Sequence, residues 1–201
     1  LVVAFDLLMQ MYLEEGYSKR KAVEAIIEKN LYGLDICPRA AGLANFAILL
    51  KAALYHANIL QDSHYPHVYA MPEAFDFTRN QVETFLGSRG IDHVDEIHTA
   101  FKTLTQGQNI GSALILSLSE EARAHLRVAI STKEIGSLDL SDQMTLKRML
   151  PFAQVAAILT DNFPAVVANP PYMGSKNMNA ELADYLRTLY PRSKSDLFAV
   201  F

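Results

Sequence analysis

The sequence predicts an α/β fold in which helices outnumber strands. Two short apolar runs carry this prediction, because 31–36 and 163–168 have the length and composition of buried strands. A third observation is the helical spacing of apolar residues over most of the chain between them. Open α/β sheets place their chemistry at the carboxyl ends of strands, so the ends of these two runs are candidate sites.

Apolar periodicity and capping signals predict the other elements in order along the chain. We expect helices at 2–15, 18–29, 38–60, 80–88, 94–104, 119–130, 141–160 and 179–190, and strands at 31–36, 111–117 and 163–168. The connection between the strands at 31–36 and 163–168 is longer than plain βα units require, which favours a mostly helical insertion. We therefore expect core at 1–61, an insertion at 62–150 and core again at 151–201, with 111–117 as an edge or insertion strand.

The helix expected at 38–60 begins at Pro38, a residue that suits the first helical position. Its apolar residues recur at helical spacing, which predicts that one face packs on a sheet. That predicted face consists of Leu43, Phe46, Ala47, Leu50 and Leu54.

The tetrapeptide Asn169-Pro170-Pro171-Tyr172 directly follows the apolar run at 163–168. Two prolines fix the backbone and remove two N–H donors, so the Asn169 and Pro170 carbonyls can face a ligand. An amide oxygen, a free carbonyl and an aromatic ring suit a planar amino-bearing group, such as a nucleobase with an exocyclic amine. The alternative is an asparagine-initiated turn before the helix at 179–190, which does not explain Tyr172.

Asp35 ends the first predicted strand, where nucleotide-binding folds use a carboxylate to accept hydrogen bonds from a ribose diol. The alternative is that Asp35 caps the helix that follows. The two strand-end motifs support one another because each follows a strand.

An Asn-Pro-Pro-Tyr motif after an apolar strand resembles the catalytic motif of amino-group methyltransferases, chiefly the N6-adenine DNA enzymes. The resemblance implies a partial Rossmann-like fold, S-adenosylmethionine as cofactor and double-stranded DNA as substrate. It also implies that Asn169, Pro170, Pro171 and Tyr172 are catalytic. Asp35 then corresponds to the residue that holds the cofactor's ribose, and Ile36 to the residue against its adenine.

Three further segments are similar to the PglX-type adenine methyltransferases of bacterial BREX phage-defence systems. They are Leu1-Val-Val-Ala-Phe-Asp-Leu-Leu8, Gly33-Leu-Asp-Ile-Cys-Pro-Arg-Ala-Ala41 and Gly111-Ser-Ala-Leu-Ile115. Cys37 departs from the pattern, which has an acidic residue there, and this affects helix capping more than ligand binding. The segment 195–201 resembles the helix after the catalytic loop, so Leu197 and Phe201 would line the adenine pocket, with core packing as the alternative.

Such enzymes cradle the methionine end of the cofactor on a glycine-rich turn, and none precedes Asp35. We therefore expect the natural protein to begin before Leu1 and the 201-residue chain alone to be inactive.

Composition predicts a cytoplasmic protein without a membrane span, since no apolar run approaches the necessary length. The single cysteine suits a reducing compartment. The net charge of −4 is unlike that of a self-sufficient DNA binder, so other regions should supply most DNA affinity. His64 and His67 have a ligand-like separation, but Pro66 indicates an exposed loop, and we predict no metal site.

Alternative functions remain open from the sequence. A protein glutamine amide presents the same NH2 geometry as adenine, and cytosine N4 is a further acceptor. A catalytically silent binding module with this fold is the alternative outside enzymes. Other defence-system proteins are possible partners.

Overall fold

The computed structural model describes residues 1–61, 64–132, 140–169 and 178–200. The chain divides into two compact units, Leu1–Met71 and Pro72–Phe201. Each unit is described by itself. The finer division at 61/62 and 150/151 stays a prediction.

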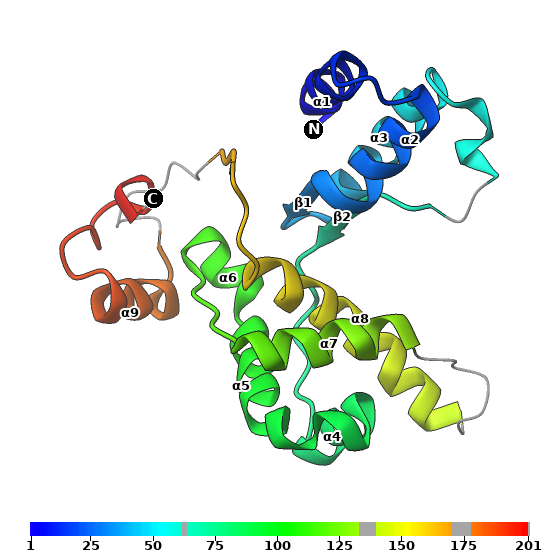
Figure 1. Cartoon of the computed structure of the whole chain (residues 1–201). Coiled ribbons are helices and arrows are strands. Elements are labelled where there is room, and N and C mark those ends of the chain that lie inside the picture. The colour runs from blue at the N-terminus through cyan, green and yellow to red at the C-terminus, as the bar shows by residue number, and fades with distance from the viewer. Residues whose placement is uncertain (62–63, 133–139, 170–177, 201) are drawn as a thin grey trace. The chain divides into compact units, whose positions relative to one another are not determined.

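The first unit is a helical layer on a small sheet (Figure 1). Ser18 caps α2 by accepting a hydrogen bond from the Lys21 N–H, a role that serine commonly has at the position before a helix. The elements in order are α1 (Val2–Glu14), α2 (Lys19–Ala25), the π-helical turn η1 (Ile26–Asn30), β1 (Tyr32–Asp35), α3 (Pro38–Ala53), the 3-10 turn η2 (Ala57–Leu60) and β2 (His67–Ala70).

The strands β1 and β2 pair in parallel, with Tyr32 opposite His67 and Asp35 opposite Ala70. A parallel pair needs a crossover connection, and α3 supplies it, so β1, α3 and β2 form a βαβ unit. The described part of the chain is thus mostly helical with a small parallel sheet, in agreement with the predicted α/β class.

The strand β2 was not predicted, and the placement of His67 in an exposed loop is wrong. His67 is half-buried in β2, stacks on the Tyr32 ring at 5.1 Å between centroids, and shares a 2.9 Å hydrogen bond with the Tyr69 hydroxyl. The misleading signal was Pro66, which directly precedes the strand, a position that sheets tolerate.

The predicted packing face of α3 is also wrong. Leu43, Phe46, Leu50 and Leu54 are exposed, whereas Ala41, Ile48 and Ala52 are buried in the core of the unit. The rotation of α3 is fixed by Asn45, whose side-chain amide donates a 2.8 Å hydrogen bond to the Val68 carbonyl of β2. Because both faces of α3 are apolar, periodicity alone could not choose between them.

The second unit is built mainly from helices. Thr78 and Gln81 form a reciprocal capping box at the start of α4, a local signal that the sequence carries plainly. The elements are α4 (Arg79–Leu86), η3 (Ser88–His93), α5 (Val94–Leu104), α6 (Gly107–Ile110), η4 (Gly111–Ala113), α7 (Glu120–Thr132), α8 (Leu140–Leu159), α9 (Ala180–Leu189) and η7 (Leu197–Val200).

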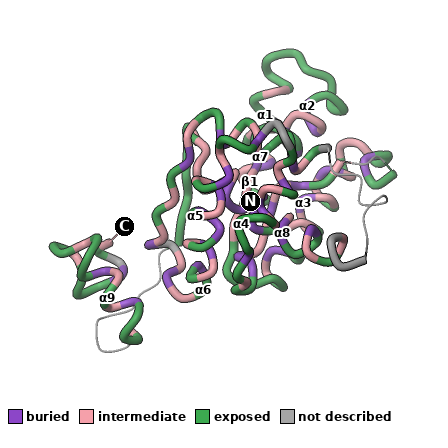
Figure 2. Tube along the Cα trace, turned by 90° about the horizontal axis from the view of Figure 1, so that it is seen from below, coloured by how far each residue is buried: buried purple, intermediate pink, exposed green. Residues whose placement is uncertain are grey.

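The core of this unit is aromatic. Phe77 and Phe152 meet edge to face at 4.9 Å between ring centroids, and Phe101 lies 5.8 Å from Phe152. Buried residues recur along α5 (Figure 2), where Ile97, Phe101 and Leu104 face inward at helical spacing. This periodicity made α5 predictable from sequence.

Two predicted strands are absent from the structure as described. The segment 111–117 is the turn η4 followed by irregular chain, and its Ile115 N–H donates to the Tyr185 hydroxyl rather than to a strand. The segment 163–168 is irregular, with Val166 77% and Val167 98% exposed. A strand needs a neighbour that satisfies its backbone, and no neighbouring strand is present among the described residues of this unit.

Across the described residues, no helix combines the length and apolar character that crossing a bilayer requires.

Candidate functional site

Asp35 is the last residue of β1, and its carboxylate is held by the turn into α3. One carboxylate oxygen accepts a 2.8 Å hydrogen bond from the Cys37 N–H. None of the hydrogen bonds between described residues uses the other oxygen, and Asp35 is exposed. The next residue, Ile36, is 51% exposed. The strand end thus presents an oriented carboxylate beside an apolar side chain.

The end of β2 lies directly beside the backbone of Asp35. Asp35 is in register with Ala70, and the Met71 N–H donates a 2.8 Å hydrogen bond to the Asp35 carbonyl. The carboxyl ends of both strands therefore form one edge, the position where α/β sheets bind ligands. The sequence analysis did not predict β2, so it assigned no candidate residue to this strand. The short apolar run Val68–Met71 was the available signal.

Asn169 lies in the second unit and is exposed. It follows α8 after an irregular segment, and no hydrogen bond between described residues engages its side chain. The partners of an Asn-initiated turn would be residues outside the described ranges, so the alternative that the sequence left open stays open. Pro170, Pro171, Tyr172 and Phe201 lie outside the described residues.

The chain from residue 178 onward is held in the second unit through α9. Asn179 caps α9, since its side-chain oxygen accepts a 2.8 Å hydrogen bond from the Leu182 N–H. The Asn179 amide also donates to the Asn109 side chain on α6, and the Asn109 amide donates to Glu181 at 2.7 Å. This polar network fixes where α9 begins relative to α6.

Leu197 is buried, at 4% exposure, in a cluster with Ile110, Ala113, Leu182 and Leu186. Its side chain takes part in core packing, the alternative that the sequence left open. A contact between Leu197 and a cofactor stays a prediction.

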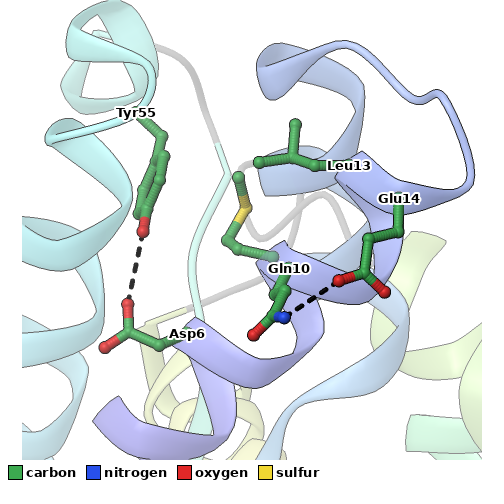
Figure 3. Close-up of a pocket in the computed structure, with 6 residues that line it drawn as sticks. Asp6, Gln10, Leu13, Glu14 and Tyr55 are labelled. Atoms are coloured by element: carbon green, nitrogen blue, oxygen red, sulfur yellow. Dashed lines mark hydrogen bonds between the residues drawn. The ribbon is translucent and has the colours of Figure 1, made fainter.

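The first unit has a surface depression between α1 and the end of α3 (Figure 3). Its polar groups engage one another, because the Tyr55 hydroxyl donates to Asp6 at 3.4 Å and the Gln10 amide donates to Glu14 at 2.9 Å. Asp6 also forms a 2.8 Å ion pair with Lys51. With its polar groups engaged, this depression carries no catalytic arrangement.

The described residues contain no group of three or more histidine, cysteine, aspartate or glutamate side chains that could hold a metal ion. His64 Nδ1 instead lies 2.5 Å from a carboxylate oxygen of Glu28. The absence of a metal in the whole protein stays a prediction.

Residues 29–201 match the family described as the Eco57I restriction-modification methylase, and the chain belongs to this family. The match contains the four candidate residues that the structure describes, Asp35, Ile36, Asn169 and Leu197.

Two adenine-specific methyltransferases are similar to this chain over its whole length. The chain is 34% identical over 206 residues to the adenine-specific methyltransferase PglX of Lacticaseibacillus casei (strain Zhang). It is 29% identical over 221 residues to the adenine-specific methyltransferase BrxX of Escherichia coli O9:H4 (strain HS). Both alignments cover the whole of this chain but only 17% and 18% of the relatives. The resemblance to PglX-type enzymes is thereby confirmed.

Proposed function

We propose that the protein containing these residues is a site-specific N6-adenine DNA methyltransferase that marks self DNA in phage defence. Membership of the methylase family and the names of the two relatives support this proposal. The observation that carries it within the chain is the exposed position of Asn169 at the start of an Asn-Pro-Pro-Tyr tetrapeptide.

The strand edge of the first unit fits S-adenosylmethionine. A carboxylate oxygen of Asp35 is available to accept hydrogen bonds from a ribose, and the exposed Ile36 offers an apolar contact for a purine ring. Bound there, the cofactor would supply an electrophilic methyl group on a sulfonium. We assign Leu197 and Phe201 to the same adenine pocket as a proposal from the family resemblance.

The proposed role of the tetrapeptide is to hold the target amine. The Asn169 side-chain oxygen and the Pro170 carbonyl each accept one amino hydrogen, which favours a tetrahedral nitrogen as positive charge develops. This stabilisation is greater in the transition state than in the ground state, so it accelerates the reaction. Pro171 rigidifies the loop, and Tyr172 stacks on the base, offsetting part of the few kcal/mol that base extrusion costs.

Double-stranded DNA is the proposed substrate, and other defence-system proteins are proposed partners. The net charge of −4 predicts that most phosphate contacts come from regions outside these 201 residues. The partial Rossmann-like fold, the helical insertion at 62–150 and a cytoplasmic location belong to the same proposal.

The test is base analysis of DNA from a host with and without the complete gene. N6-methyladenine at a defined sequence is expected only with the intact gene. In the purified protein, Asn169→Ala should lower the methylation rate by at least about 100-fold, the typical effect of removing one preorganised polar contact. Cofactor affinity should stay unchanged.

The matched control is Asn162→Ala, which removes another exposed asparagine seven residues earlier and should leave the rate unchanged. Full activity of Asn169→Ala would overturn the assigned role. Methylated glutamine or N4-methylcytosine in place of N6-methyladenine would replace the proposed substrate. A protein that binds cofactor but methylates nothing would indicate the silent module.

A further inference from the structure

Two arginines of α7 hold the residues at which α8 ends, and we call these four residues the α8 clamp: Arg123, Arg127, Thr160 and Asp161. Arg123 Nη1 donates a 2.7 Å hydrogen bond to the Thr160 carbonyl and lies 3.8 Å from one carboxylate oxygen of Asp161. Arg127 Nη2 donates a 2.6 Å hydrogen bond to the other carboxylate oxygen of Asp161. The two arginines are one helical turn apart, so both project from the same face of α7.

The packing of α7 on α8 does not require these charged groups. The two helices lie side by side (Figure 1), and their buried residues include Leu126, Ala129, Phe152 and Ala156. The Arg123 side chain is only 19% exposed, and its Nε–H is buried without a hydrogen-bond partner among the described residues. Burying an incompletely paired charge costs stability, which an apolar side chain would not. The contact that accounts for an arginine here is therefore its hold on the end of α8.

The chain that leads from the α8 clamp to Asn169 has few contacts of its own. Among the described residues, 164–168 make no backbone hydrogen bond, and Val167 is 98% exposed. The course of this stretch thus depends on where the chain is fixed before residue 164. On the far side of the tetrapeptide, Asn179 is fixed by its hydrogen bond to Asn109 of α6. The segment that carries the tetrapeptide is therefore tied at both ends to other helices of the second unit.

Exposure indicates which arginine contributes more to the α8 clamp. The Arg127 side chain is 53% exposed, so water and salt screen its ion pair with Asp161. The Arg123 side chain is mostly buried, and a hydrogen bond is stronger where water is excluded. Removing Arg123 should therefore displace the end of α8 more than removing Arg127.

We propose that Arg123 and Arg127 are positioning residues: by fixing the end of α8, they set the point from which the chain reaches Asn169. This inference rests on the proposed function, because it assigns the two arginines a role in the same reaction. They act through Asn169 and have no need to touch DNA or cofactor. A misplacement of about 1 Å can cost about 100-fold in rate, so loss of the α8 clamp should lower kcat without changing cofactor affinity.

A distance measurement by pulsed electron paramagnetic resonance on the complete protein tests the α8 clamp without using the methylation reaction. Nitroxide-labelled noncanonical residues replace Val167 and Met144 of α8, which are 98% and 55% exposed. Arg123→Met should shift or broaden the distribution of distances between the two labels. The matched control is Arg79→Met, which removes a 2.6 Å ion pair with Asp95 between α4 and α5 and should leave the distribution unchanged.

Steady-state kinetics of the complete protein connects the α8 clamp to the reaction. Arg123→Met should lower kcat about 10- to 100-fold, with the calorimetric affinity for S-adenosylmethionine unchanged. Arg123→Lys should recover part of the rate, because a lysine ammonium also donates to a carbonyl. Arg127→Met should give a smaller loss of kcat, and Arg79→Met none.

The outcomes distinguish this inference from the proposed function. If the unmutated protein methylates adenine, an unchanged distance distribution or an unchanged kcat in Arg123→Met would overturn the positioning role and leave the proposed function standing. If Arg123→Met does not fold, unmutated values of both quantities in Arg127→Met would overturn it equally. An unmutated protein that does not methylate adenine would overturn the proposed function and the positioning role together, even if the distance distribution responds to Arg123→Met.

Discussion

The two units of the chain differ in how completely they cover their own apolar side chains. The second unit encloses Phe77, Phe101 and Phe152 between its helices, with the last two 1% and 2% exposed. The first unit is smaller, yet it contains most of the exposed large apolar side chains among the described residues, including Leu43 and Leu54. The second unit therefore buries most of its own large apolar side chains, whereas the first unit leaves many of its own on surfaces suited to further contacts.

This difference follows from the elements used. Helices satisfy their backbone internally, so a few of them can enclose a core from sequence neighbours alone. A two-stranded parallel sheet leaves outer edges and a face that need other layers. The same openness leaves accessible the strand edge where Asp35 and Met71 meet, which is the proposed ligand site.

The largest expected effect on stability is in the aromatic core of the second unit. Phe152→Ala should lower the free energy of unfolding by about 3–5 kcal/mol, because it removes a buried ring from a packed cluster. Met144→Ala on the same helix is the control, since Met144 is 55% exposed and should have little effect. Denaturant unfolding measures both. Equal losses of unfolding free energy in the two variants would contradict the contrast between enclosed and exposed side chains.

The next largest effect is on ligand binding by the first unit. Asp35→Ala should weaken S-adenosylmethionine binding about 10- to 100-fold, since a hydrogen bond to a charged group contributes about 1.5–3 kcal/mol. Calorimetric titration of the complete protein measures it.

Asp6→Ala is the control for that titration, because Asp6 is already paired with Lys51. Asp35→Asn keeps an acceptor for the Cys37 N–H but removes the charge, so it separates loss of the turn from loss of ligand contacts. Wild-type affinity in Asp35→Ala would show that the strand edge does not hold the ribose.

A smaller effect is expected where the sheet contacts the helical layer. A Cβ at Gly33 would approach the Val68 side chain to 3.0 Å and the Leu1 side chain to 3.1 Å. Gly33→Ala should therefore destabilise by about 1–3 kcal/mol, the usual range for overpacking. Gly42→Ala adds a Cβ with nothing within 4 Å and should instead stabilise by about 0.5–1 kcal/mol. Thermal unfolding of both variants compares the covered and open sides of the unit.

The smallest effect is a pH dependence in the first unit. Burial, with Tyr32 nearby, raises the pKa of Tyr69. The stabilisation linked to this raised pKa is complete below the unfolded value of about 10 and is lost as pH rises toward the folded pKa. Tyr69→Phe should lose about 0.5–1.5 kcal/mol at neutral pH through its hydrogen bond to His67.

Above pH 10, wild-type stability should fall more steeply than that of Tyr69→Phe. Denaturant unfolding from pH 8 to 11 measures the two slopes. Parallel curves would mean that the Tyr69 hydroxyl is as solvated as in the unfolded chain.

Elements with local signals were predictable and those with distant partners were not. The Thr78 capping box and the inward spacing of α5 lie within a few residues, and the structure contains both helices. By contrast, 163–168 has strand composition but no strand neighbour among the described residues, while His67–Ala70 has weak strand signals and pairs with β1. Composition does not reveal which segment finds a partner.

The family resemblance, the helical framework and the candidate residues Asp35 and Asn169 are readable from the amino-acid sequence, because motifs and periodicity involve neighbouring positions. The folded chain was needed to establish which face of α3 is buried, that Met71 completes the edge beside Asp35, and that Leu197 packs in a core cluster. These features depend on contacts between residues far apart in the chain. Competing packings of similar apolar character are possible, so neighbouring residues alone do not determine which contacts form.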